Sequence, residues 1–239
     1  MDELTVGIYV PSYHRSDKIL TYHLFEKCKY LVRKSEAQAY MDAGIAPEDI
    51  WAVEDELINS GSKAYFYAFY NAPEDIIVVA DDDIKDVIFR LDEPNPCKQN
   101  KERITDEIYR IAQLVHDLGI GLASNPHSGP LYNYDKEFGW KGIPGAIKWV
   151  NRGVFQAKRD VDVVNNFDID IILQELLVNR ITLIPKYFLL DSFIDTNAGG
   201  NSERLRQDQI DSIGNMKLKW GKYFDFDFKK NKPTIRVKR

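Results

Sequence analysis

Three consecutive aspartates, Asp81, Asp82 and Asp83, follow the apolar run Ile76 to Ala80. Adjacent carboxylates repel one another, and the arrangement becomes favourable when a hard divalent cation takes oxygen ligands from them. If the apolar run is a central strand, the aspartates lie at its carboxyl end, where open α/β sheets bind ligands. The triplet therefore predicts a site for Mn²⁺ or Mg²⁺ that is shared with the phosphates of a nucleotide. The alternative is a solvated acidic turn that Lys85 partly neutralises.

Other metal-binding and phosphate-binding motifs are missing from the sequence, which argues against the classes of site that those motifs form. The chain has no GxxxxGK(S/T) loop, no GxGxxG loop and no aspartate spacing typical of a calcium loop. A phosphatase of the haloacid dehalogenase type would carry DxDx(T/V) after its first strand, whereas this triplet follows about the fourth. Cys28 and Cys97 lie far apart without a CxxC or Cys/His spacing, so neither a zinc site nor a disulfide framework is expected.

Strands and helices alternate around the triplet. We predict a first strand over Leu4 to Val10 that Pro11 ends, and a helix with Ser35 as its N-cap and Gly44 as its stop. The helical stretch "SKAYFYAFYNAPED" then leads directly into the strand before the triplet. Such alternation, with unbroken apolar strands, is typical of a mixed, mostly parallel α/β sheet of the Rossmann type that helices flank on both faces.

The pattern continues after the triplet. The helix "RITDEIYRIAQLVHDLG" leads into a short strand from Ile120 to Ala123. Two later strands, in "AIKWVNRGVFQAKRD" and "ITLIPKYFLLD", flank the helix "DIDIILQELLVNR". Between Pro126 and Gly145 glycine, proline and aromatic residues dominate, which indicates a mobile or substrate-facing loop.

Composition is that of a soluble globular protein. The 239 residues are 44% hydrophobic and 29% charged. No apolar run approaches the roughly 18 residues that a membrane-spanning helix needs. We expect a single domain over residues 1–239. The acidic N-terminus lacks the basic start and cleavage site of a secretory signal, which favours a cytoplasmic protein without a membrane partner.

Positive charge gathers at the C-terminus. The net charge of −5 argues against a generic nucleic-acid binder, yet the last eleven residues, "KKNKPTIRVKR", hold six basic residues and no acid. Together with Trp140, Trp149 and Trp220, this tail could serve a polyanionic or aromatic partner. The alternative is a disordered, solubilising end.

Three stretches together resemble a GT-A fold glycosyltransferase of the DxD type, over about residues 4 to 190: "VGIYVPSYHR", the helix before "IIVVADDDI", and "NFDIDIILQELL". The order of these elements carries the resemblance. It implies a GT-A-like fold and transfer of a sugar from a nucleotide-sugar donor to an acceptor hydroxyl. It also implies Mn²⁺ or Mg²⁺ as cofactor and a UDP-sugar as the expected donor. Residues 1–125 would bind the nucleotide sugar, and residues 126–239, with the basic tail, would face the acceptor.

The resemblance also implies roles for single residues. The loop after the first strand would hold the nucleotide, through Pro11, Ser12, Tyr13 and Arg15. Asp83 is the first metal ligand that it implies. Asp81 would address the ribose or a water beside the cation and stands as a second metal candidate, and Asp82 would help either.

A later acidic pair faces the acceptor in that family, and here the chain reads "FDID" where many relatives have a Glu-Asp pair. Asp168 matches the second member and is the candidate general base of an inverting mechanism, with Asp170 as the second choice. On a helix the two side chains point about 200° apart and should not share one role. The alternative for both is a favourable interaction with the helix dipole.

Three further features of the sequence suggest ligand contacts. Lys63 and Tyr67 lie one turn apart on the helix before the triplet and could face the nucleotide, unless this is a solvated helix face. The segment "DTNAGGNSER" offers backbone amides and Arg204 as ligands for a diphosphate. The alternative is a flexible loop without a binding role. Three residues of "NPHSGPLYNY" are expected to line an acceptor site: His127, Tyr132 and Tyr134. The alternative is that they are surface aromatic residues of a loop.

A narrower resemblance concerns the acceptor. The short chain and the opening "VPSYHRSDK" are similar to phage DNA-modifying glycosyltransferases, which act on hydroxymethylated pyrimidines in duplex DNA. That resemblance implies a DNA acceptor, a flipped target base and, for a phage protein, the host cytoplasm. Two alternatives stay open. A nucleotidyltransferase would share the fold but usually has a glycine-rich loop after its first strand, and a non-catalytic nucleic-acid-binding module would leave the triplet without a role.

Overall fold

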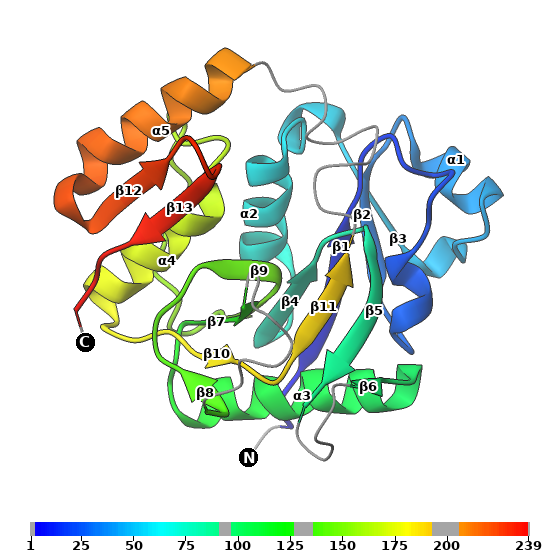
Figure 1. Ribbon diagram of the computed structural model, residues 1–239. Coiled ribbons are helices and arrows are strands. Elements are labelled where there is room, and N and C mark those ends of the chain that lie inside the picture. The colour runs from blue at the N-terminus through cyan, green and yellow to red at the C-terminus, as the bar shows by residue number, and fades with distance from the viewer. Residues whose placement is uncertain (1–2, 91–96, 127–135, 193–205, 239) are drawn as a thin grey trace.

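The computed structural model describes residues 3–90, 97–126, 136–192 and 206–238. Its centre is a six-stranded sheet in the order β3-β2-β1-β4-β9-β7 (Figure 1). The strands are β1 (Val6–Pro11), β2 (Lys29–Arg33), β3 (Ile50–Val53), β4 (Ile76–Ala80), β7 (Leu122–Pro126) and β9 (Pro144–Asn151). The strands β3, β2, β1 and β4 pair in parallel, and β9 pairs antiparallel with both β4 and β7. The prediction of a mixed, mostly parallel α/β sheet is confirmed.

Helices cover both faces of this sheet. They are α1 (Ala37–Asp42), α2 (Gly61–Asn71), α3 (Lys101–Asp117), α4 (Phe167–Val178) and α5 (Arg206–Trp220). On one face Ile77 and Val79 of β4 join a core with residues of α2 and α4, and on the other Ile76 and Val78 join a core with residues of α3. All five residues of β4 are buried, because each side chain meets one of these two layers.

Smaller sheets surround the central one. They consist of β5 (Ile84–Phe89), β6 (Cys97–Lys98) and β11 (Leu189–Ser192); β8 (Phe138–Gly139) and β10 (Ile184–Pro185); and β12 (Phe224–Asp227) and β13 (Lys232–Ile235). Short 3₁₀ turns lie at Thr21–Leu24, Pro47–Asp49, Asp55–Leu57 and Gly221–Tyr223. The strand β5, which the sequence reading did not anticipate, begins directly after the acidic triplet and pairs antiparallel with β11.

The C-terminal segment is ordered as a hairpin rather than as a loose tail. The strands β12 and β13 lie beside α4 and α5 (Figure 1). Phe224 and Phe226 pack with Ile213 and Met216 of α5 in a third core cluster, against which Ile235 also packs. The alternation of buried and exposed residues along β12 leaves the charged side chains of the hairpin on its outer face.

Several local predictions were displaced or wrong. The first strand runs from Val6 through Pro11, since pairing with β2 continues up to Ser12, whose amide donates to the Leu31 carbonyl at 3.1 Å. The strand expected at Ile120 to Ala123 is Leu122–Pro126. Ser35 is not an N-cap, because α1 begins at Ala37 without a side-chain cap and the Ser35 hydroxyl donates instead to Asp55 at 2.5 Å.

The proposed partner role of Trp149 was also wrong. Its side chain is fully buried, and its indole N–H donates to the Ile108 carbonyl at 3.1 Å, so it joins β9 to α3. Trp140, by contrast, is 47% exposed. Among the described residues, no helix is long and apolar enough to cross a membrane.

Candidate nucleotide and metal site

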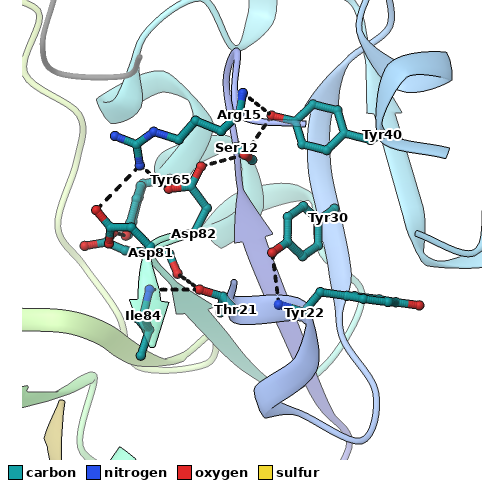
Figure 2. Close-up of polar contacts among 11 residues, drawn as sticks. Ser12, Arg15, Thr21, Tyr22, Tyr30, Tyr40, Tyr65, Asp81, Asp82 and Ile84 are labelled. Atoms are coloured by element: carbon teal, nitrogen blue, oxygen red, sulfur yellow. Dashed lines mark hydrogen bonds and ion pairs between the residues drawn. The ribbon is translucent and has the colours of Figure 1, made fainter. Parts of the chain in front are cut away.

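The acidic triplet lies at the carboxyl end of β4, and the backbone around it is fixed from both sides. The Asp81 amide donates to the Ala146 carbonyl of β9 at 3.0 Å. The hydroxyl of Thr21 donates to the Asp81 carbonyl at 2.8 Å and accepts from the Ile84 amide at 3.1 Å (Figure 2). One threonine, about sixty residues upstream, thus holds the turn that presents the three carboxylates.

Asp82 joins this turn to the loop that follows β1. Its two carboxylate oxygens accept from the Ser12 hydroxyl at 2.5 Å and from the Arg15 guanidinium (Figure 2). The phenol of Tyr40 shares a hydrogen bond with the Ser12 hydroxyl at 2.7 Å and accepts from the Arg15 amide at 3.2 Å. Asp82 is 7% exposed, and burial raises its pKa despite the opposing charge of Arg15. Both of its oxygens are engaged within the protein.

Asp83 is the more accessible carboxylate. Its side chain is 20% exposed, and the Arg15 guanidinium approaches it to 3.5 Å. Burial, followed by the charges of Asp81 and Asp82, raises the pKa of Asp83 to about 6. The charge of Arg15 opposes this rise but does not cancel the combined effect of burial and the two neighbouring carboxylates.

Asp81 is held from the side of α2. The Tyr65 hydroxyl donates to one of its carboxylate oxygens (Figure 2). Burial, and after it the charge of Asp81, raises the pKa of Tyr65 well above 10. The Lys148 ammonium lies 4.9 Å from the centre of the Tyr65 ring, and the Phe167 ring lies 5.3 Å from it on the side of α4.

The two acids of the first turn of α4 have different surroundings. Asp168 is half-buried, and its charge is among those that raise the pKa of Tyr65, which places it on the side of the triplet. Asp170 is 2% exposed and accepts from the Trp220 indole at 2.7 Å and the Lys219 ammonium at 2.9 Å. Asp170 therefore links α4 to the end of α5, whereas Asp168 lies near the acidic site.

The donor set fits a hard divalent cation. Asp81 and Asp83 present carboxylates at the end of β4, and the charge of Asp168 acts on Tyr65, which binds Asp81. The cations near these groups include Arg15 and Lys148. Within the described ranges no three acidic, histidine or cysteine side chains converge into a ready-made cage. Mg²⁺ in proteins is commonly held by one or two carboxylates and substrate phosphates, so the missing ligands are ones that a nucleotide diphosphate supplies.

The other residues that the sequence predicts for the site make various contacts in the structure. Pro11 is the last residue of β1, and the Tyr13 ring lies 3.8 Å under the Arg33 guanidinium. The Lys63 ammonium donates to the Glu56 carbonyl at 3.0 Å. Tyr67 packs on Trp51 with ring centres 5.4 Å apart. The remaining predictions lie outside the described residues: His127, Tyr132, Tyr134 and the segment 195–204 with Arg204.

Four residues of this region were missed from the sequence. They are Thr21, Tyr40, Tyr65 and Lys148, to which the sequence analysis assigned no role. Lys148 carries the clearest signal, because a lysine inside the apolar run "AIKWV" needs a partner if the strand is central. Tyr65 shares its helix with other aromatic residues, so spacing alone does not separate it from the core.

Comparisons with known proteins were made at the level of sequence and of structure. No family model and no curated protein matches the chain. Glucosyl-3-phosphoglycerate synthase from Mycobacterium tuberculosis, in complex with phosphoglyceric acid, resembles it with a TM-score of 0.51 at 10% identity, over 98% of this chain and 87% of that one. The same enzyme in complex with Mn²⁺, UDP and glucosyl-3-phosphoglycerate gives a TM-score of 0.50 at 10% identity and the same coverage.

A structure described as a mycobacterial protein has a TM-score of 0.51 at 11% identity, over 98% of this chain and 83% of that one. At such identities the likeness shows the fold alone. The chain has the GT-A, Rossmann-like fold. The activity must be argued from the residues of the site.

Proposed function

We propose that this protein is a metal-dependent glycosyltransferase that moves a sugar from a nucleotide-sugar donor to an acceptor hydroxyl. The observation that carries the proposal is the acidic triplet at the carboxyl end of β4, tied by Asp82 to Ser12 and Arg15 of the loop after β1. In α/β sheets of this kind the ligand binds at that edge. The similar synthase binds UDP and Mn²⁺, which supports a UDP-sugar as donor here.

The contacts of Asp82 with the β1 loop support the donor-side roles that we propose. The β1 loop with Pro11, Ser12, Tyr13 and Arg15 binds the nucleotide, and Asp82 holds that loop in place. Asp83 and Asp81 would hold Mn²⁺ or Mg²⁺. When bound, the cation neutralises the negative charge of the departing diphosphate. Lys63 and Arg204 are proposed as further donor contacts.

Asp168 is the proposed general base for the acceptor hydroxyl. It is half-buried, and its charge is among those that raise the pKa of Tyr65, which supports a position near the acidic edge of the sheet. One of its oxygens accepts from the Ile169 amide at 2.9 Å. A base must reach the hydroxyl that attacks the sugar and take its proton. Asp170, the second choice, is occupied by Lys219 and Trp220, and its geometry favours a structural role.

The acceptor proposed is a hydroxymethylated pyrimidine in duplex DNA. The support is electrostatic, because exposed lysines gather on the C-terminal hairpin: Lys222, Lys229, Lys230, Lys232 and Lys238. A groove beside β13 adds Lys141 next to Lys232. Phosphate backbones are bound by such side chains, and a target base would have to leave the stack to reach the donor.

Nucleotide binding tests the proposal most directly. Because a ligand that binds the folded state raises the melting temperature, UDP with Mn²⁺ should stabilise the protein more than UDP in EDTA. Asp83→Asn should lose this Mn²⁺-dependent gain and abolish transfer from a UDP-sugar to hydroxymethylated DNA, while keeping its circular dichroism spectrum. An equal gain in wild type and Asp83→Asn would contradict the metal assignment.

The same assay separates the alternatives. A nucleotidyltransferase would be stabilised by a nucleoside triphosphate and release pyrophosphate, and a non-catalytic nucleic-acid module would respond to no nucleotide. Sugar transfer is read as a mass increase of the acceptor equal to one sugar residue.

A further inference from the structure

Tyr65 contacts the acidic site in a way that neither the motif nor the fold requires. It lies in α2, is 6% exposed, and donates its phenol hydrogen bond to one oxygen of Asp81. The ring is held on several sides, with Phe69 at 6.0 Å and Phe167 at 5.3 Å between ring centres. A rotamer so enclosed has little freedom to turn away from the carboxylate.

Lys148 fixes the same ring from β9. Its side chain is buried at 3% exposure, and the ammonium donates to the Gly145 carbonyl at 2.9 Å while it lies 4.9 Å from the Tyr65 ring centre. A cation over the face of a tyrosine is attractive, most of all where water is excluded. The position of the Tyr65 hydroxyl is therefore set by both α2 and the central sheet.

The three carboxylates of the triplet are consequently not equivalent. Both oxygens of Asp82 accept hydrogen bonds, from Ser12 and Arg15. One oxygen of Asp81 accepts from Tyr65. Its second oxygen has no hydrogen-bond partner within the part of the chain that the structure describes. Asp81 is thus held at one oxygen and open at the other.

We propose that Tyr65 is a positioning residue for the divalent cation, because its hydroxyl holds one oxygen of Asp81 and so directs the other toward the cation. The proposal rests on the proposed function for the presence of a cation at this edge. Residues that orient a metal ligand typically alter metal affinity by 10-fold to 100-fold when they are changed. Tyr65→Phe, which removes only the hydroxyl, should weaken Mn²⁺ binding by about 10-fold.

The chain offers a matched control. Tyr187 is also a buried tyrosine whose hydroxyl donates to a carboxylate, that of Glu107. Glu107 belongs to α3, on the opposite face of the sheet from α2. Tyr187→Phe therefore reproduces the loss of a buried phenol-carboxylate hydrogen bond without touching the triplet. Melting curves of both variants in EDTA report whether either loses its fold.

The experiment has two arms. In the first, the signal of free Mn²⁺ in electron paramagnetic resonance gives the Mn²⁺ affinity of the protein without nucleotide. In the second, UDP binding is titrated with Mn²⁺ and repeated in EDTA. We expect Tyr65→Phe to need about 10-fold more Mn²⁺ in both arms, with UDP affinity in EDTA unchanged and full UDP affinity restored at saturating Mn²⁺. Tyr187→Phe should match wild type throughout.

Each outcome decides the proposal. If Tyr65→Phe and Tyr187→Phe need the same Mn²⁺ concentration as wild type, Tyr65 does not position the cation, although the proposed function stands. If UDP affinity falls equally with Mn²⁺ and in EDTA, Tyr65 acts on the nucleotide or the fold and the proposal is wrong. If Mn²⁺ binds and Tyr65→Phe weakens it but UDP does not bind, the inference holds and the proposed donor is wrong. A wild type that binds no Mn²⁺ in either arm overturns both.

Discussion

The ionised form of Asp83 is destabilised in the metal-free protein, because the side chain is partly buried beside two like charges. Its pKa rises from 3.8 to about 6 on folding. A carboxyl whose pKa is higher in the folded than in the unfolded state contributes its full stabilisation only when the pH is below the unfolded pKa. For Asp83 this contribution to the free energy of unfolding is lost as the pH rises through about 6. A cation at the site would remove the destabilisation of the ionised form, which couples metal binding to stability.

This linkage gives a prediction for Asp83→Asn in EDTA. At pH 7.5 the variant should be more stable than wild type by about 1 kcal/mol, after allowance for solvent screening of a partly exposed group. The difference should shrink as the pH falls from 6 toward 4, because wild-type Asp83 then becomes protonated. Urea unfolding at several pH values measures it. A constant difference across this range would argue against the raised pKa.

Asp168 gives a second prediction at the residue scale. Asp168→Asn should lower turnover by roughly 100-fold or more while donor affinity is retained, as loss of a general base does. Steady-state kinetics with a UDP-sugar, together with UDP titration, separate the two effects. Weaker UDP binding with unchanged turnover would place Asp168 in the donor site instead.

At the scale of elements, α4 and α5 are joined by a buried ionic contact. The carboxylate of Asp170 receives hydrogen bonds from Lys219 and Trp220 of α5 and from Gln174 of its own helix. Asp160 accepts from the same lysine at 2.8 Å, and this hydrogen bond lowers the pKa of Asp160. The contact holds α5, which precedes the C-terminal hairpin, against α4.

Removal of this carboxylate should therefore be costly. Asp170→Ala leaves the Lys219 ammonium and the Trp220 indole with unmet hydrogen bonds, and we expect a loss of about 3 kcal/mol in the free energy of unfolding. Glu54→Ala is the control, because Glu54 is 61% exposed in its ion pair with Lys34 and should change stability by less than about 1 kcal/mol. Equal effects in urea unfolding would show that the buried contact contributes little.

At the scale of the whole molecule, charge is strongly segregated. The 23 residues from Lys217 to Arg239 hold nine of the 32 Lys and Arg residues and only two of the 37 Asp and Glu residues. The rest of the chain is therefore strongly acidic. Such asymmetry steers a polyanion toward one side of the molecule and keeps it from the remainder.

Charge removal on the hairpin tests the DNA acceptor. We change to Gln four exposed lysines: Lys229, Lys230, Lys232 and Lys238. Affinity for duplex DNA should fall and the slope of log affinity against log salt should flatten by up to about 3 to 4, while UDP affinity stays unchanged. Fluorescence anisotropy at several salt concentrations measures both.

The matched control has four exposed lysines changed to Gln in β2 and the residues that flank it in the sequence: Lys18, Lys27, Lys29 and Lys34. The strand β2 lies on the opposite side of Figure 1 from the hairpin. The control variant should keep most of the salt slope. If the hairpin variant binds DNA as wild type does, the hairpin is not a DNA contact and the acceptor proposal loses its physical support.

Much of the fold could be predicted because the elements that form it are locally encoded. The apolar run before Asp81 reads as a buried strand, and the helical spacing before and after it was read correctly. The strand β5 was missed because it follows three aspartates and alternates less clearly, and Trp149 was misread because aromatic residues occur in cores and at surfaces alike. The division into halves at residue 125 stays a prediction.

By itself, the sequence determined the alternation of strands and helices, the position of Asp81 to Asp83 at a strand end, and the basic character of the C-terminus. Only the tertiary structure decided which carboxylate oxygens of the triplet accept hydrogen bonds from the protein, because the donor groups come from distant elements. Ser12 and Arg15 reach Asp82 across about seventy residues, and Tyr65 reaches Asp81 from a helix on one face of the sheet. Hydrogen bonds of this kind depend on side-chain placement in space, which no local pattern of residue types encodes.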